Sequence, residues 1–263
     1  MIKLIASDLD GTLIPEGTQQ VEEGFFEVLQ ELLDRGYMFY VASGRQYANI
    51  RMVFSDFADR IGFVCENGAM AMEQEQLEYV LEIPWEKARA IAEDILQFPE
   101  LDICMSGVKA CYIKPRTEWY EDQLVNVLKN KCVIFDDLDE IDDRVVKIAM
   151  QVYDFPKNAE RFQRFFQEKY GDFADFVYGG NGWLDMMLKD SGKGLALDHI
   201  LKKKGLTPDE LMVFGDNQND ISMLQLTPNS YVMAHAKPDV KAYGAHTCAS
   251  VTAFLKEFLK TAL

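Results

Sequence analysis

The chain has 263 residues and a formal net charge of −16, with 43 acidic side chains against 27 lysines and arginines. This acidity argues against extended binding to nucleic acid or to an anionic membrane surface, because such partners need a basic protein face. Hydrophobic residues make up 48% of the chain, which is enough for a sizeable core. We find neither a secretory signal nor an apolar run near the roughly 20 residues of a membrane span. We therefore expect a cytoplasmic protein that binds neither nucleic acid nor membrane.

The cysteines and histidines show none of the spacings that zinc sites use. There is no CxxC pair among the cysteines and no HExxH motif around the histidines. The sequence therefore predicts no zinc site and reduced, scattered thiols at Cys65, Cys104, Cys111, Cys132 and Cys248.

Residues 1–81 alternate predicted strands with predicted helices. A buried strand over 2–7 (IKLIAS) is followed by a helix whose apolar face carries Phe25, Leu29 and Leu32 and which ends near Gly36. A strand over 37–43, a helix near 46–57, and a strand with a turn over 61–68 follow. Alternation of this kind predicts a parallel sheet with right-handed crossovers.

Residues 82–188 follow a different pattern, in which a helix and two strands recur three times. We expect helices from Pro84, over 118–129 and over 156–170, and strands over 101–106, 109–114, 132–135, 145–153, 173–179 and 183–188. This order predicts an antiparallel sheet covered by helices on one face.

After Lys193 the alternation of strands and helices returns. A helix to about residue 204, strands over 210–216 and 230–234, and a helix from about 251 are predicted. Residues 1–81 and 189–263 should therefore form one parallel α/β domain, into which an α+β domain of residues 82–188 is inserted.

Polar motifs stand where the predicted parallel strands end, at the edge where open sheets bind ligands. SDLDGT ends the first strand and FGDNQND ends the strand after the insertion, so Asp8, Asp10, Asp216 and Asp220 should converge. Such a cluster is tolerable around a hard divalent cation, and Mg²⁺ is the commonest choice.

A phosphate-binding site is predicted at the same edge. Ser43 and the backbone amides around Gly44, in the motif ASGR, suit a phosphate, as does Lys193 in the motif SGKG. The cation and Lys193 would supply the positive charge that this acidic chain otherwise lacks.

The motifs DLDGT, ASGR, GKG and GDNQND, in this order, resemble the four motifs of the haloacid dehalogenase superfamily of phosphohydrolases. The insertion resembles the C2B cap of its Cof-type branch. The resemblance covers essentially the whole chain and implies an α/β fold. Its catalytic core would be a Rossmann-like parallel sheet (1–81 and 189–263), and its cap would be the α+β segment 82–188.

The resemblance also implies a role for each motif residue. Asp8 would be the nucleophile that forms an aspartyl-phosphate, and Asp10 the general acid and base. Thr12 would support Asp10 or its loop. Metal ligation would fall to Asp8, Asp10 (through its backbone carbonyl), Asp216 and Asp220, and phosphate binding to Ser43, Gly44, Lys193 and Asn219.

The last strand of the insertion offers a candidate substrate-binding face. Alternation places Leu184, Met186 and Leu188 toward the core of this domain and Trp183, Asp185 and Met187 on the opposite face. An aromatic ring beside a carboxylate suits a sugar, and the related cap of phosphomannomutases carries a similarly placed acid. The alternative interpretation is that Asp185 is an ordinary exposed acid on a strand face.

Together these patterns indicate a Mg²⁺-dependent phosphatase that hydrolyses small phosphorylated metabolites, with sugar phosphates as the favoured class. One alternative is a phosphomutase or phosphotransferase of the same superfamily. A regulatory protein that accepts a phosphoryl group without turnover is another, although receiver domains are shorter and carry the acceptor on a middle strand. The third is a non-enzymatic binding protein, against which the complete set of carboxylates argues.

Overall fold

The computed structural model describes residues 1–180 and 182–261, and its contacts divide the chain into two compact units. The first unit comprises Met1–Tyr79 and Gly192–Leu263, and the second comprises Val80–Ser191. These limits lie within three residues of the change of pattern in the sequence. Within the described ranges, no helix is both long enough and apolar enough to cross a membrane.

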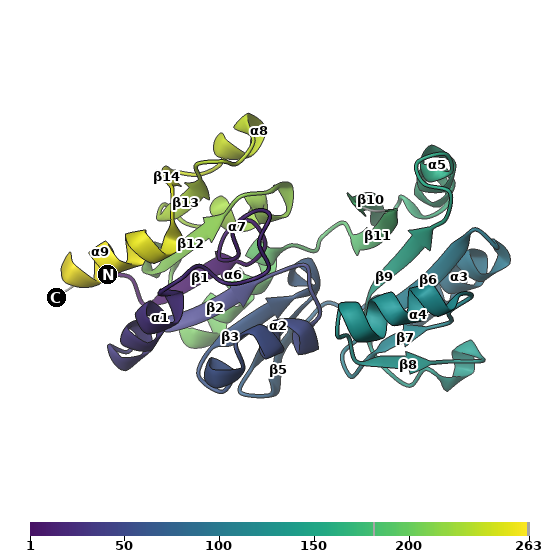
Figure 1. Cartoon of the computed structure of the whole chain (residues 1–263), viewed down its shortest axis with the longest axis horizontal. Coiled ribbons are helices and arrows are strands. Elements are labelled where there is room, and N and C mark those ends of the chain that lie inside the picture. Colours follow the sequence, from purple (N-terminus) through teal and green to yellow (C-terminus); the bar gives the residue numbers. More distant parts are fainter. Residues whose placement is uncertain (181, 262–263) are drawn as a thin grey trace. The chain divides into compact units, whose positions relative to one another are not determined.

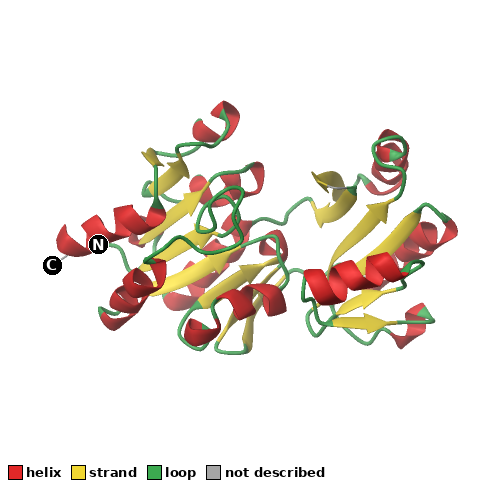
Figure 2. Cartoon of the chain, in the orientation of Figure 1, coloured by secondary structure: helices red, strands yellow, loops and turns green. Residues whose placement is uncertain are grey.

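An eight-stranded sheet forms the first unit, with helices packed along it (Figures 1 and 2). The strand order is β14-β13-β12-β1-β2-β3-β4-β5, and the pairs from β14 to β3 are parallel, which confirms the predicted α/β class. The strands are β1 Leu4–Asp8, β2 Met38–Ala42, β3 Gly62–Cys65, β4 Met70–Glu73, β5 Gln76–Val80, β12 Leu211–Gly215, β13 Ser230–Met233 and β14 His246–Cys248. The helices are α1 Phe25–Asp34, α2 Tyr47–Val53, α6 Lys193–Lys204, α7 Ile221–Leu224, α8 Pro238–Lys241 and α9 Val251–Thr261.

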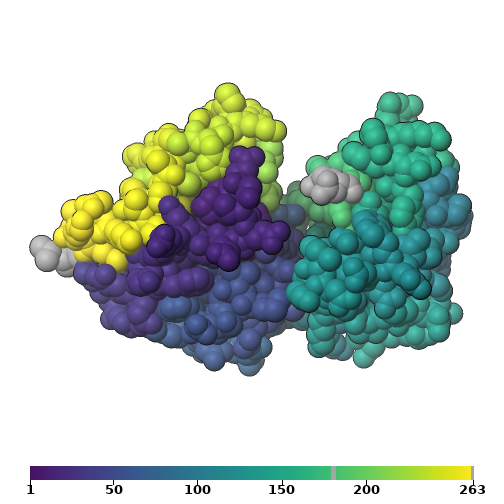
Figure 3. Space-filling model, viewed as in Figure 1, coloured from purple at the N-terminus to yellow at the C-terminus, as the bar shows by residue number. Residues whose placement is uncertain are grey.

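Apolar contacts cover both faces of this sheet. On one face, Leu4 and Ala6 of β1 share a buried cluster with Leu197 of α6. On the other face, the ring of Phe25 in α1 meets the ring of Phe39 in β2 edge to face at 5.6 Å. The C-terminal helix α9 lies beside α1, as Figures 1 and 3 show. All five residues of β1 are buried, so the sequence-predicted central strand is confirmed.

The sheet is not parallel throughout, because β4 and β5, which were not predicted, extend it beyond its parallel part. β4 runs antiparallel to β3, because the turn Glu66–Gly68 that joins them is too short to carry a crossover helix. Gln74 and Glu75, both with positive φ, then form the two-residue turn between β4 and β5. β4, β5 and β14 were not predicted from the sequence.

The second unit contains a six-stranded sheet with the order β10-β11-β9-β6-β7-β8. Its α+β class agrees with the prediction, and Leu184, Met186 and Leu188 belong to the main core of this unit as expected. The strands are β6 Leu101–Gly107, β7 Cys111–Ile113, β8 Cys132–Ile134, β9 Val145–Val152, β10 Ala174–Gly180 and β11 Trp183–Leu188. The helices are α3 Trp85–Gln97, α4 Glu118–Asp122, which continues as a π-helical turn Gln123–Val127, and α5 Ala159–Tyr170.

Two features of this second sheet correct the prediction. β7 and β8 run parallel, because the chain between them returns through α4 as a crossover rather than through a hairpin. Helices also cover both faces. Residues of α3 and α5 join the main core, whereas Tyr120 and Leu124 pack on the other face with Cys104 and Ala149. The helix predicted over 118–129 ends at Val127 in the structure, and its second half is the π-helical turn.

Candidate active site

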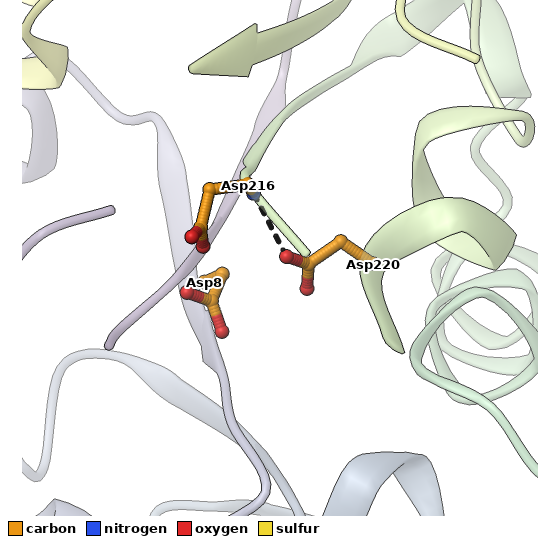
Figure 4. Close-up of side chains that lie close together, drawn as sticks. All are labelled: Asp8, Asp216 and Asp220. Carbon is orange, nitrogen blue, oxygen red and sulfur yellow. Dashed lines mark hydrogen bonds between the residues drawn. The ribbon is translucent and has the colours of Figure 1, made fainter. Parts of the chain in front are cut away.

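Four charged side chains meet at the carboxyl end of the parallel strands in the first unit. Asp8 is the last residue of β1, and Asp216 follows the neighbouring strand β12. Asp220 ends the 3₁₀ turn Gln218–Asp220, and Lys193 is the first residue of α6. One carboxylate oxygen of each aspartate lies within 4.8 Å of the others, and Figure 4 shows the three side chains together. The structure thus brings together three of the four aspartates that the sequence placed at this edge.

The ammonium group of Lys193 is fully buried between two of these carboxylates. Its Nζ donates to Asp8 Oδ1 at 2.5 Å and to Asp220 Oδ1 at 2.6 Å. Burial by itself would lower the pKa of Lys193, but the charges of Asp220 and Asp8 outweigh burial and raise that pKa above its usual value. Lys193 is therefore a permanent cation of this site.

The site nevertheless carries excess negative charge. Three carboxylates and one ammonium group give a net charge of −2. Burial, followed by the charge of Asp220, raises the pKa of both Asp8 and Asp216. Asp8 Oδ2 is buried and has no hydrogen-bond partner among the residues that the structure describes. This oxygen and the two neighbouring carboxylates together offer the oxygen ligands that a hard divalent cation prefers. These residues therefore fit Mg²⁺.

Hydrogen bonds orient the other two carboxylates. Asp220 Oδ2 accepts from the backbone amides of Asp216 and Asn217 at 2.9 and 3.0 Å. Thr12 Oγ1 donates to Asp216 Oδ1 at 3.1 Å. The sequence assigned Thr12 to Asp10 or to its loop, and the structure pairs it with Asp216 instead. Such bonds fix the direction in which a ligating carboxylate points.

The carboxylate of Asp10 lies outside the acidic cluster. Arg45 Nε donates to Asp10 Oδ2 at 2.8 Å, and a terminal nitrogen of the same guanidinium binds Oδ1. The Asp10 side chain is 50% exposed. Gly11, with φ +93°, turns the chain directly after Asp10, and a Cβ at this glycine would collide with Asp216. The metal-ligand role predicted for Asp10 concerns its backbone carbonyl and not this carboxylate.

Asn67 connects the residues predicted to bind phosphate. Its backbone amide donates to the carbonyl of Ser43 at 3.0 Å, and its Oδ1 accepts from Asn219 Nδ2 at 2.9 Å. A Cβ at Gly44 would lie 2.8 Å from the same Oδ1, so the close approach requires glycine there. Ser43 and Asn219, which are distant in sequence, therefore share one neighbour.

Sequence reasoning missed Asn67 and His235 as members of this site. His235 Nε2 lies 3.6 Å from Asp216 Oδ2. His235 comes just after β13, so the rule that ligands bind beyond strand ends could have found it. Asn67 has φ +57°, a conformation that asparagine tolerates, and a single sequence reads it only as part of a turn.

The two candidate substrate residues lie in the second unit and face opposite to its main core. The ring of Trp183 packs near the ring of Tyr120, with centroids 5.7 Å apart. Asp185 Oδ2 lies 3.9 Å from Lys147 Nζ, and the two side chains are only 22% and 12% exposed. The alternative of a freely solvated acid at Asp185 does not match this partly buried pair, and Lys147 was not anticipated from the sequence.

The chain is similar to known proteins along nearly its whole length. A family model of haloacid dehalogenase-like hydrolases matches residues 5–253. The 5-amino-6-(5-phospho-D-ribitylamino)uracil phosphatase of Escherichia coli (strain K12) is 29% identical over 95% of this chain and 91% of its own. A solved structure from Streptococcus mutans UA159 has a TM-score of 0.82 and 28% identity, and covers 99% of this chain and 100% of that one.

A second solved structure shares the fold. It is the subclass IIB sugar phosphatase BT4131, with a TM-score of 0.78 and 23% identity over 97% of this chain and 98% of that one. The matched family model spans nearly the whole chain, both units included. This chain therefore belongs to the haloacid dehalogenase-like hydrolase family, as a phosphatase of its Cof-type branch.

Proposed function

We propose that this enzyme is a Mg²⁺-dependent phosphatase that hydrolyses small phosphate monoesters through an aspartyl-phosphate on Asp8, with sugar and sugar-alcohol phosphates as its preferred class. The observation that carries the proposal is the state of Asp8. One of its oxygens is bound to a buried lysine. The other is buried beside two more carboxylates and accepts no hydrogen bond from the described part of the chain. A carboxylate held in this way has one oxygen left for nucleophilic attack.

Asp8, Asp216 and Asp220, with the backbone carbonyl of Asp10, would hold the cation. When bound, Mg²⁺ would neutralise the site and polarise the phosphoryl oxygens. Lys193, Ser43 and the amide of Gly44 would bind the remaining phosphoryl oxygens, and Asn219 would support them through its hydrogen bond with Asn67. Every one of these groups comes from the first unit.

The reaction itself needs one nucleophile and one proton carrier. An oxygen of Asp8 attacks phosphorus, and the bond from phosphorus to the ester oxygen breaks. Asp10 gives its proton to the departing alkoxide. Asp10 then takes a proton from the water that attacks the aspartyl-phosphate. The bond from phosphorus to the Asp8 oxygen breaks, inorganic phosphate is released, and the carboxylate of Asp8 is restored. The exposed position of Asp10, outside the metal cluster, suits this role.

Two observations support the substrate class. The Escherichia coli relative is named for a substrate with a phosphorylated ribityl chain, which is a sugar-alcohol phosphate. Trp183 and Asp185 place a partly buried ring and a carboxylate on one sheet face, and Lys147 adds a hydrogen-bond donor there. In this proposal the second unit acts as the cap that recognises the leaving group, and the first unit handles phosphate and metal.

A turnover screen tests the proposal. Phosphate release is measured with p-nitrophenyl phosphate, hexose phosphates, ribitol 5-phosphate, flavin mononucleotide, pyridoxal phosphate and nucleotides, with Mg²⁺ and with excess chelator. We expect release that requires Mg²⁺ and is fastest with sugar or sugar-alcohol phosphates, and none with Asp8→Asn. Full activity in chelator would refute the metal assignment. Transfer to a labelled acceptor alcohol without phosphate release would favour the phosphotransferase alternative.

A further inference from the structure

Three of the five cysteines come together on neighbouring strands of the second unit. Cys104 lies on β6, Cys111 on β7 and Cys132 on β8. The sulfur atoms of Cys104 and Cys111 are 2.8 Å apart. Cys111 and Cys132 are direct partners in the parallel pairing of β7 with β8. The sequence predicted scattered thiols, so this grouping is a product of the fold.

The three thiols differ in access and in acidity. Cys104 and Cys111 are buried, whereas Cys132 is partly exposed on the edge strand of the sheet. The hydrogen bonds with Cys104 and Cys132, followed by burial, raise the pKa of Cys111. The hydrogen bond with Cys111 lowers the pKa of Cys132 and outweighs the opposing effect of burial. Among the three, Cys132 is therefore the thiol that combines access to solvent with a lowered pKa, and both properties favour reactivity.

We propose that Cys132 is a peroxide-reactive thiol that forms a reversible disulfide with Cys111. Directly paired residues on neighbouring strands are about 4.8 Å apart. That separation lies inside the range of Cα separations, roughly 4.4–6.8 Å, that a disulfide can bridge. The pair can therefore close without a rearrangement of the sheet.

The oxidant in this proposal is hydrogen peroxide, and the steps balance. The Cys132 thiolate attacks one peroxide oxygen, the O–O bond breaks, and the released hydroxide takes a proton to become water. The product is a sulfenic acid on Cys132. The Cys111 sulfur then attacks the Cys132 sulfur, and the S–O bond breaks to release a second water. Two thiols are oxidised by two electrons in total, and one peroxide is reduced.

The disulfide would close the segment of chain that contains α4 and the π-helical turn. Tyr120, in that segment, packs near the ring of Trp183, on the sheet face that also carries Asp185. Oxidation would therefore restrain the element that covers part of this face. The modification itself is independent of the phosphatase chemistry, because every residue involved lies in the second unit.

Peptide mapping can identify the bond directly. Cleavage after lysine and arginine places Cys104, Cys111 and Cys132 in separate peptides, 90–109, 110–116 and 132–144. Cys65 and Cys248, both buried in the first unit, fall in peptides 61–87 and 242–256 and serve as internal controls. The full-length protein is treated with a small excess of hydrogen peroxide, its free thiols are blocked under denaturing conditions, and the peptides are analysed by mass spectrometry.

We expect the 110–116 and 132–144 peptides to become linked, the link to disappear with dithiothreitol, and the two control cysteines to stay reduced. Cys132→Ser should abolish oxidation of Cys111, whereas Cys104→Ser should leave the link intact. Dimedone should trap a sulfenic acid on Cys132 in the Cys111→Ser variant. A link between Cys104 and Cys111, oxidation of Cys65 or Cys248 at the same rate, or undiminished oxidation of Cys111 in Cys132→Ser would each overturn the proposal.

Discussion

The guanidinium of Arg45 binds both carboxylate oxygens of Asp10, two residues beyond the buried Asp8. A further terminal nitrogen of Arg45 donates to Asn49 Oδ1 at 3.1 Å, so the guanidinium is itself held in place. The ion pair of Arg45 with Asp10 gives the two aspartates of the DLD motif different surroundings. Asp8 faces the acidic cluster and Asp10 faces Arg45, which suits different tasks for the two carboxylates.

Arg45→Met should release Asp10 from its fixed position. An alkyl phosphate needs a proton on its leaving oxygen, so kcat for such a substrate should fall about tenfold. p-Nitrophenolate leaves without a proton, and its release should change much less. Arg51→Met, which removes an arginine of α2 that pairs with Glu75, is the matched control. Equal losses on both substrates would mean that Arg45 supports phosphate binding or the fold instead.

Asp8→Asn should abolish phosphatase turnover and leave the folded protein intact. Because burial and the charge of Asp220 raise the pKa of Asp8 above its unfolded value, the ionised carboxylate destabilises the metal-free protein at neutral pH. The variant also lowers the net negative charge of the site. Its melting temperature in chelator should therefore equal or exceed that of the wild type. A folded variant with near-wild-type turnover would contradict the assignment of the nucleophile.

Mg²⁺ should stabilise the wild-type protein because it neutralises the excess charge of the site. At a hundredfold excess over its Kd, the ion should add about 2.7 kcal/mol to the free energy of unfolding. The melting temperature should then rise by roughly 5–10 °C. Asp216→Asn should remove most of this rise, whereas Asp59→Asn, a change at an acid that is 82% exposed, should not. An unchanged Mg²⁺ response in Asp216→Asn would argue against Asp216 as a ligand.

Lys193→Met should lower the free energy of unfolding of the metal-free protein by about 3–5 kcal/mol, because it leaves Asp8 and Asp220 buried without their cation. Added Mg²⁺ should restore part of this loss but not the activity. Lys204→Met removes a more exposed pair with Glu73 and should cost less than about 1 kcal/mol. Denaturant unfolding with Mg²⁺ and with chelator measures both variants. If the two variants lost similar free energies of unfolding, Lys193 would stabilise the protein no more than the more exposed Lys204 does.

Asp185→Ala should lower kcat/KM for sugar phosphates by roughly 1–3 kcal/mol in apparent transition-state binding, if a hydrogen bond to a hydroxyl is lost. p-Nitrophenyl phosphate has no hydroxyl group for Asp185 to bind, so its kcat/KM should hardly change. Asp172→Ala, at an exposed turn after α5, is the control. A parallel loss on both substrates would assign Asp185 to the stability of the second unit, where it lies near Lys147.

The sequence by itself determined the class of the fold and indicated the aspartates and the lysine that meet at one edge of the sheet. Buried strands such as β1 are recognisable because every residue is apolar or small up to the first aspartate. Asp8, Asp216 and Lys193 could be assigned to one edge because parallel strands all end there. The face of β11 that carries Leu184 and Met186 followed from simple alternation.

Only the tertiary structure decided how those residues are paired. Periodicity records which side of its own strand a residue occupies, but not which distant element covers that side. The sequence therefore gave no sign that α4 packs against the Trp183 face, that Arg45 takes Asp10 out of the acidic cluster, or that Asn67 joins Ser43 to Asn219. The three thiols likewise meet only because β6, β7 and β8 lie side by side, and contacts between separate strands are set by packing rather than by local pattern.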